Sequence, residues 1–215
     1  MLTFKQTAIG EVPENWNIIR LDELASVKRG KFSIRPRNDP RFYGGSVPFV
    51  QTGDVVAANG HLRTHHQTLN ENGLAVSKLF PAPTILLTIA ANIGDTAITT
   101  YPVCCPDSVV GIQPNATIDV RWLREALASR KNELNQKATQ NAQKNINLQH
   151  LKPLLVPTPP SEEQAAIGLR AETFDRTLMA MSETLEALRH SKRSLICDLL
   201  TGKKRVSTDI LMAAE

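Results

Sequence analysis

The 215-residue sequence has few cysteines and no long apolar run. Its three cysteines fit neither an even disulfide framework nor a CxxC zinc motif, because Cys104 and Cys105 are adjacent and Cys197 lies far from them. We therefore expect reduced, packed thiols. Nowhere are about 18 apolar residues consecutive, and the N-terminus has no basic stretch followed by an apolar one. The sequence thus predicts a cytoplasmic protein that does not enter a membrane.

Motifs for nucleotide, covalent or metal chemistry are also missing. The sequence contains no GxxxxGK(S/T), GxGxxG or GxSxG pattern. The segment TPPS at 158–161 lacks the leading amide or acid and the trailing aromatic of amino-methyltransferases. His61 and His65 have the spacing of a helical metal site, but Leu62 stands where a metalloprotease needs glutamate, and we predict no metal site. These absences favour a binding module without catalytic activity and without a cofactor of its own.

Positive charge is concentrated in one segment, although the formal net charge of the chain is only +4. The segment 28–41 reads KRGKFSIRPRNDPR and holds six cations against one acid. Its Gly, Pro, Ser and Asn content predicts a loop. Such a loop suits phosphate neutralisation and counterion release. The alternative is a solvated basic loop without a ligand.

The sequence changes in character near residue 160. Before it, short apolar runs rich in β-branched residues and bounded by Gly, Pro and Asn predict the strands of a mostly β domain. The predicted strands cover 16–21, 47–52, 83–89, 96–101, 108–112 and 154–157. One helix is predicted within this domain, over about 119–136. We predict an α+β domain over 1–158, a long helix over 159–202 and a basic, flexible tail over 203–215.

The long helix begins with a capping signal. Ser161 can serve as N-cap, Gln164 can reach back to the cap N–H, and Glu162 and Glu163 suit the positive end of the helix dipole. Apolar residues then recur at a spacing of three and four, which predicts a coiled coil within an assembly or between two copies of the chain. A single helix lying across its own domain is the alternative. The predicted contact stripe is Ile167, Phe174, Leu178, Met181, Leu185, Leu188, Leu195 and Leu199.

Three polar segments have the chemistry to read base edges. The connection 138–147, ATQNAQKNIN, offers Asn and Gln for adenine and Lys for guanine or phosphate. It can equally be a polar loop that caps the helix and turns the chain. The segments 49–55 (FVQTGDV) and 89–97 (IAANIGDTA) end apolar strands in polar turns, which could project from one edge of a sheet.

Six segments follow one another in a specific order: VPENWNIIRLDELASVKRG, VPFVQTGDV, LLTIAANIGDTAI, NAQKNINLQHL, LLVPTPPSEEQAAI and DLLTGKKRV. This ordered set resembles the DNA-specificity subunit of type I restriction-modification enzymes over nearly the whole chain. Members of that family usually carry two units of a target-recognition domain and a spacer helix. This sequence has one such unit, which resembles a half-subunit or a fragment of a longer chain.

The resemblance implies a non-catalytic subunit that recognises half of a bipartite DNA site. The implied partners are double-stranded DNA, a methyltransferase subunit with or without a restriction subunit, and a second copy joined through an antiparallel coiled coil. S-adenosylmethionine, Mg²⁺ and ATP would then serve the partner subunits. Expected phosphate contacts are Arg29, Lys31, Arg35, Arg37 and Arg41, and expected base readers are Tyr43, Arg63, Asn92, Gln140, Asn141, Gln143 and Lys144.

Two other classes of function stay open at this point. One is a self-contained nuclease or methyltransferase with unfamiliar motifs, which would modify DNA without a partner. The other is a structural coiled-coil adaptor whose basic loop is incidental.

Overall fold

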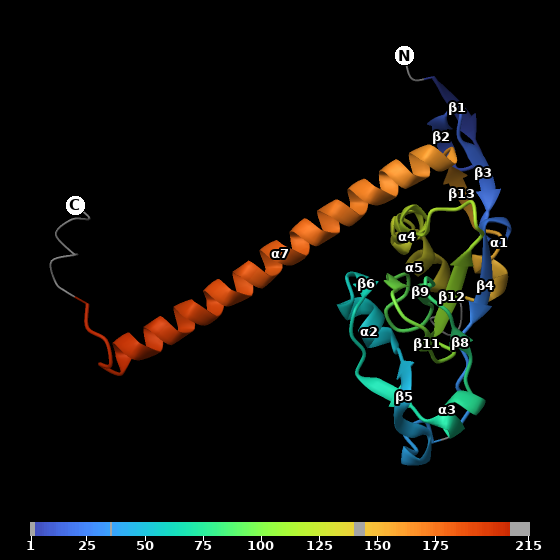
Figure 1. The fold of residues 1–215 in the computed structure, drawn as a ribbon. Coiled ribbons are helices and arrows are strands. Elements are labelled where there is room, and N and C mark those ends of the chain that lie inside the picture. Colours follow the sequence, from blue (N-terminus) through green and yellow to red (C-terminus); the bar gives the residue numbers. More distant parts are fainter. Residues whose placement is uncertain (1–2, 35, 140–144, 207–215) are drawn as a thin grey trace. The chain divides into compact units, whose positions relative to one another are not determined.

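The computed structural model describes residues 3–34, 36–139 and 145–206 of the chain. Close contacts divide the chain into two compact units, Met1–Glu172 and Thr173–Glu215, which we call unit 1 and unit 2. All the strands that the structure describes belong to unit 1, and unit 2 holds the greater part of the last helix (Figure 1). The predicted α+β class with a long C-terminal helix is confirmed.

The centre of unit 1 is a five-stranded sheet with the order β4-β12-β9-β10-β6. Its pairs are antiparallel except that of β10 with β6. The strands are β4 (Ala25–Arg29), β6 (Gly60–Leu62), β9 (Ile85–Thr88), β10 (Thr96–Thr99) and β12 (Val109–Pro114). All residues of β9 and β10 are buried, because both faces of the sheet are covered. This explains why β9 has three consecutive apolar residues, Ile85–Leu87, rather than an alternating pattern.

Alternate residues of β9 supply two separate parts of the core. Leu87 packs in a cluster with Trp122 and Leu127, whereas Leu86 packs in a second cluster with Phe80. The Phe80 ring lies directly against the sheet at Gly111, where a Cβ atom would come within 2.3 Å of the ring. Only glycine therefore allows this close approach.

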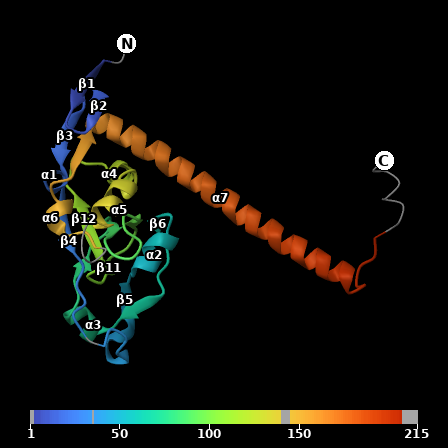
Figure 2. The same cartoon turned by 180° about the vertical axis from the view of Figure 1, so that it is seen from behind.

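Three smaller sheets complete unit 1. A four-stranded sheet has the order β7-β5-β11-β8, and two further sheets pair β1 with β2 and β13 with β3. Figure 2 shows β3 and β13 side by side, so the segment between them starts and ends at neighbouring strands. The strands are β1 (Phe4–Thr7), β2 (Gly10–Pro13), β3 (Asn17–Arg20), β5 (Tyr43–Phe49), β7 (Gln67–Leu69), β8 (Leu79–Phe80), β11 (Val103–Cys104) and β13 (Leu155–Thr158).

The helices are α1 (Leu21–Leu24), the 3-10 helix η1 (Pro40–Phe42), α2 (Thr52–Ala57), α3 (Glu71–Ala75), α4 (Val120–Ala128), α5 (Lys131–Thr139), α6 (Leu148–Leu151) and α7 (Ser161–Leu200). The prediction of a single helix over 119–136 is wrong, because α4 ends at Ala128 and α5 begins at Lys131. Ser129 bonds back to the Ala126 carbonyl at this break. Both pieces still face the core, which is why their apolar spacing looked continuous.

The first turns of α7 are fixed to unit 1, but not through the predicted capping box. Gln164 is buried, and its amide Nε2 donates to the Pro159 carbonyl at 2.9 Å. Its Oε1 accepts from the backbone N–H of Asp119 at 3.1 Å. Gln164 therefore bonds to the N-cap residue of α4 instead of closing a box with Ser161. The capping-box prediction is wrong because the glutamine is needed for packing between two helices.

Two further polar contacts support this junction. The Trp16 indole Nε1 donates to the Glu163 carboxylate at 3.1 Å, and Arg121 bonds to Glu172 at 3.2 Å. The hydrogen bonds that Arg121 donates to Asp119 and Glu172 raise the pKa of Arg121. Burial alone would raise the pKa of Asp119, but its hydrogen bonds with Arg121 and the Trp122 N–H outweigh burial and lower it. Within unit 1, the start of α7 is thus held by charges as well as by packing.

The part of α7 in unit 2 carries the predicted apolar stripe. Ile167, before this part, packs against the core of unit 1. Leu199 is partly exposed, and the remaining stripe residues are exposed: Phe174, Leu178, Met181, Leu185, Leu188 and Leu195. None of the described helices is long and apolar enough to cross a membrane.

Candidate functional site

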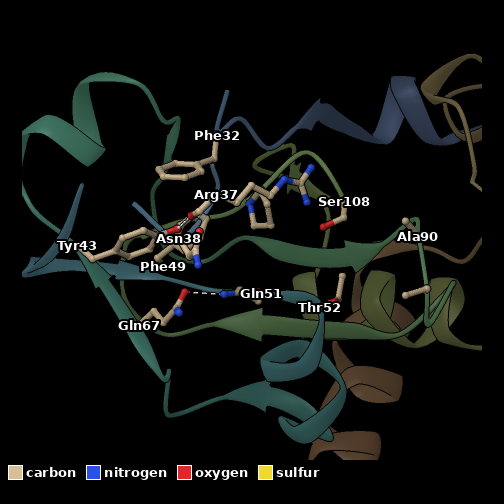
Figure 3. A pocket seen from close by; sticks show the side chains of 12 residues that line it. Phe32, Arg37, Asn38, Tyr43, Phe49, Gln51, Thr52, Gln67, Ala90 and Ser108 are labelled. Atoms are coloured by element: carbon tan, nitrogen blue, oxygen red, sulfur yellow. Dashed lines mark hydrogen bonds between the residues drawn. The ribbon is translucent and has the colours of Figure 1, made fainter. Parts of the chain in front are cut away.

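A pocket of about 490 Å³ opens in unit 1 beside β5 and β7 (Figure 3). Its lining comes from the basic segment 28–41, from the segments 49–55 and 89–97, and from the loop that follows β11. The lining residues are Phe32, Arg37, Asn38, Tyr43, Phe49, Gln51, Thr52, Gln67, Ala90, Ala91, Pro106 and Ser108. Segments that are separate in the sequence therefore meet at one site.

Aromatic rings form one wall of the pocket. Phe32 and Phe49 are each 3% exposed, and their ring centroids lie 5.0 Å apart. The Tyr43 ring packs against Phe32 with a centroid distance of 5.7 Å. The Tyr43 hydroxyl donates to the Arg37 carbonyl, and burial raises the pKa of this tyrosine, partly opposed by the charge of Arg37. The hydroxyl of this predicted base reader is thus already bonded within the protein.

Two of the predicted phosphate-contacting arginines are held in ion pairs. Arg37 bonds to Asp107 at 2.8 Å, and Arg41 bonds to Asp39 at 2.6 Å. The Arg37 and Asp107 side chains are 52% and 45% exposed, so this pair contributes little to stability. A guanidinium group has five N–H donors, and one carboxylate leaves several of them for another anion. The ion pair therefore orients Arg37 at the pocket and leaves some of its N–H donors available for a ligand.

The other predicted cations differ in their surroundings. Arg29 ends β4 and bonds to Asn145 at 3.4 Å, and Lys31 is exposed. The prediction that all of 28–41 is loop is wrong, because β4 and η1 occupy its two ends. Strand pairing with β12 extends to Arg29 and gives that end regular structure. Arg35 lies outside the described residues.

The polar connection 138–147 is described only at its two ends. The predicted readers Gln140, Asn141, Gln143 and Lys144 lie outside the described residues. After them, Asn145 forms a bridge with Ala90, and the Ile146 N–H donates to the Ile89 carbonyl at 3.0 Å. Since Ala90 lines the pocket, the end of this connection lies close to it.

The remaining predicted readers do not line the pocket. Asn92 is exposed in the β9–β10 turn, one residue after the pocket-lining Ala91, and its carbonyl accepts from the Thr88 hydroxyl. Arg63 is exposed after β6. The segment 49–55 was predicted to be a turn, and this is wrong, because α2 begins there at Thr52.

Two glutamines at the pocket were not among the expected base readers, although Gln51 lies in the polar segment 49–55. Gln51 donates through Nε2 to Oε1 of Gln67 at 2.5 Å (Figure 3). The contact follows from the pairing of β5 with β7, in which Phe49 lies opposite Gln67. The helix α2 and strand β6 separate these strands in the chain, so neither spacing nor motif indicates the pair.

The histidines at 61, 65 and 66 lie on β6 and in the connection from β6 to β7. His61 belongs to β6 rather than to a helix. The His65 Nδ1 lies 3.1 Å from the Tyr101 hydroxyl, and His66 pairs with the buried Asp54. In the part of the chain that the structure describes, no group of three or more His, Cys, Asp or Glu could hold a metal ion.

Comparison with known proteins relates the sequence to one family. A family model described as "Type I restriction modification DNA specificity domain" matches residues 13–190. The chain is 27% identical over 207 residues to the type I restriction enzyme MjaX specificity subunit of Methanocaldococcus jannaschii, which covers 96% of this chain and 47% of that protein. With the MjaVIII specificity subunit of the same organism, it is 26% identical over 220 residues, or 95% and 50% of the two chains. It therefore spans about half the length of these curated relatives.

Solved structures show the same fold. The HsdS subunit from Thermoanaerobacter tengcongensis matches with a TM-score of 0.63 at 19% identity, over 84% of this chain and 42% of that one. A chain from a structure on the assembly and conformational transition of a type I R-M system matches with 0.68 at 20%, over 91% and 48%. The S subunit from M. genitalium matches with 0.61 at 17%, over 85% and 45%. At these identities the likeness is one of fold alone.

Proposed function

Because the chain belongs to the family of type I restriction modification DNA specificity domains, we propose that unit 1 recognises a specific sequence in double-stranded DNA. One observation carries this proposal: the basic segment and the two polar strand ends line a single pocket, beside the end of the polar connection. Phosphate neutralisation and base reading need cations and polar side chains on one surface. Unit 1 has both.

The cations and the polar groups have different tasks in this proposal. Arg29, Lys31, Arg35, Arg37 and Arg41 contact phosphates and hold the protein in register on the duplex. Polar side chains around the pocket then meet base edges. The chain catalyses no reaction and needs no cofactor of its own. It directs a methyltransferase subunit, and a restriction subunit where one exists, to the site that it has bound.

The exposed stripe of α7 supports self-association within the assembly. Phe174, Leu178, Met181, Leu185, Leu188 and Leu195 would lose water contact against a second copy of the helix. Charges favour an antiparallel pair, because residues 173–188 hold three acids and one base, whereas 189–200 hold three bases and one acid. Antiparallel packing sets each acidic half against a basic half. Two copies would thereby read the two halves of a bipartite site.

Salt-dependent DNA binding tests the recognition proposal. Each phosphate contact contributes about 0.9 to the slope of log K against log salt concentration. We expect the double variant Lys31→Ala/Arg37→Ala to have a slope lower in magnitude by about 1.8 than the unmodified chain. Lys152→Ala/Arg170→Ala removes one exposed lysine and one exposed arginine outside the basic segment and serves as the matched control. Equal slopes for the two double variants would contradict the proposed surface.

A further inference from the structure

The two pocket glutamines are held in place by a chain of hydrogen bonds. Asp54, which is 6% exposed, accepts from the Gln51 backbone N–H at 2.8 Å and also bonds to His66. It therefore connects the end of β5 to the residue before β7. Between these two fixed points, Gln51 Nε2 donates to Gln67 Oε1. The Gln67 amide is thus restrained by its strand and by its neighbour.

Both amides remain accessible to a ligand. Gln51 and Gln67 are exposed side chains on the lining of the pocket. A carbonyl oxygen has two lone pairs and an amide nitrogen has two N–H groups. After the bond from Gln51, the Gln67 amide still offers one acceptor site and its N–H donors. It presents both on one planar group.

This combination of donor and acceptor matches one base in the major groove. Adenine presents N7 as acceptor beside its N6 amino donor, whereas guanine presents two acceptors and cytosine one donor. A single glutamine amide can bond to both adenine groups at once. A restrained amide also loses less conformational freedom on binding than a free side chain.

We propose that Gln67 reads an adenine of the target sequence in the major groove and that Gln51 is its positioning residue. The inference rests on the proposed function, since it assigns one base contact within the same surface. Gln67 makes the contact through both atoms of its amide, and Gln51 holds that amide in the plane of the base.

Selection from a duplex library with a randomised central segment tests the assignment. The full chain is purified from its source cells with the subunits that accompany it, and bound DNA is sequenced. Gln67→Ala should lower the preference for A·T at one position by about 5- to 150-fold and leave the other positions unchanged. Gln67→Glu should favour cytosine at that position, because a carboxylate only accepts and the cytosine amino group donates.

Two further variants separate reading from positioning. Gln51→Ala should retain adenine as the preferred base at the same position, with a weaker preference than the unmodified chain. Gln6→Ala, an exposed glutamine on β1, is the matched control and should change nothing. If the unmodified chain enriches no sequence, the recognition function itself is refuted and this inference with it. If it enriches a sequence that Gln67→Ala and Gln67→Glu select equally well, only the inference is refuted.

Discussion

Replacing Gln164 with alanine should destabilise unit 1 much more than replacing Ser161, its predicted capping partner. Gln164→Ala leaves the Pro159 carbonyl and the Asp119 N–H without their bonds in a buried place. Each buried group that loses its partner costs about 1–3 kcal/mol, so the sum for the two groups is about 2–6 kcal/mol. Ser161 is exposed, and its loss should cost less than about 0.5 kcal/mol.

Thermal unfolding followed by tryptophan fluorescence measures this difference. Both tryptophans, Trp16 and Trp122, lie in unit 1 next to the junction. For a unit of this size, 1 kcal/mol corresponds to a shift in Tm of about 2–4 °C. We expect Gln164→Ala to lower Tm by about 4–24 °C and Ser161→Ala by less than about 2 °C. Equal shifts would mean that the capping box forms after all and that the reasoning from the junction is wrong.

Two other predictions concern α7 and the thiols. Leu185→Asp should reduce the mass in solution, measured by light scattering, to that of one chain, because a dimer would bury an unpaired carboxylate. Ala187→Asp, outside the stripe, is the control. An unchanged mass for both variants would exclude the coiled-coil dimer. Burial raises the pKa of Cys104 to about 11 and that of Cys105 further, whereas Cys197 is exposed. Alkylation of the native protein at pH 8 should therefore modify Cys197 alone; labelling of all three before unfolding would contradict the buried thiols.

All six predicted strand segments contain a strand of the structure or overlap one, namely β3, β5, β9, β10, β12 and β13. The runs at 83–89 and 96–101 lie in the covered central sheet, where each position must be apolar or have its polar group bonded. The helix over 119–136 was predicted as one element because α4 and α5 face the same core. Ser129 bonds to the Ala126 carbonyl at the break, and Leu134 of α5 still packs in the same cluster as Leu127 of α4.

The candidate site was predictable only in its parts. The basic segment and the strand ends were found from their composition, since loops concentrate polar residues where strands stop. That these parts line one pocket depends on the pairing of strands far apart in the chain. Gln51 and Gln67 show this most clearly, because Gln51 lies in the predicted polar segment 49–55 but its contact with Gln67 arises only from the pairing of β5 with β7. The resemblance of six ordered segments named the family, and the family model confirms it.

The pairing of β3 with β13 has a consequence for how such proteins can change. These strands begin and end the segment that holds the central sheet, with Thr158 opposite Asn17. Insertions and exchanges succeed where the ends of a unit lie close together. A gene segment that begins at β3 and ends at β13 could therefore be replaced by another of the same family in one recombination event. Under the proposed function, the incoming segment would bring its own core and pocket together, and a new target sequence would follow in a single step.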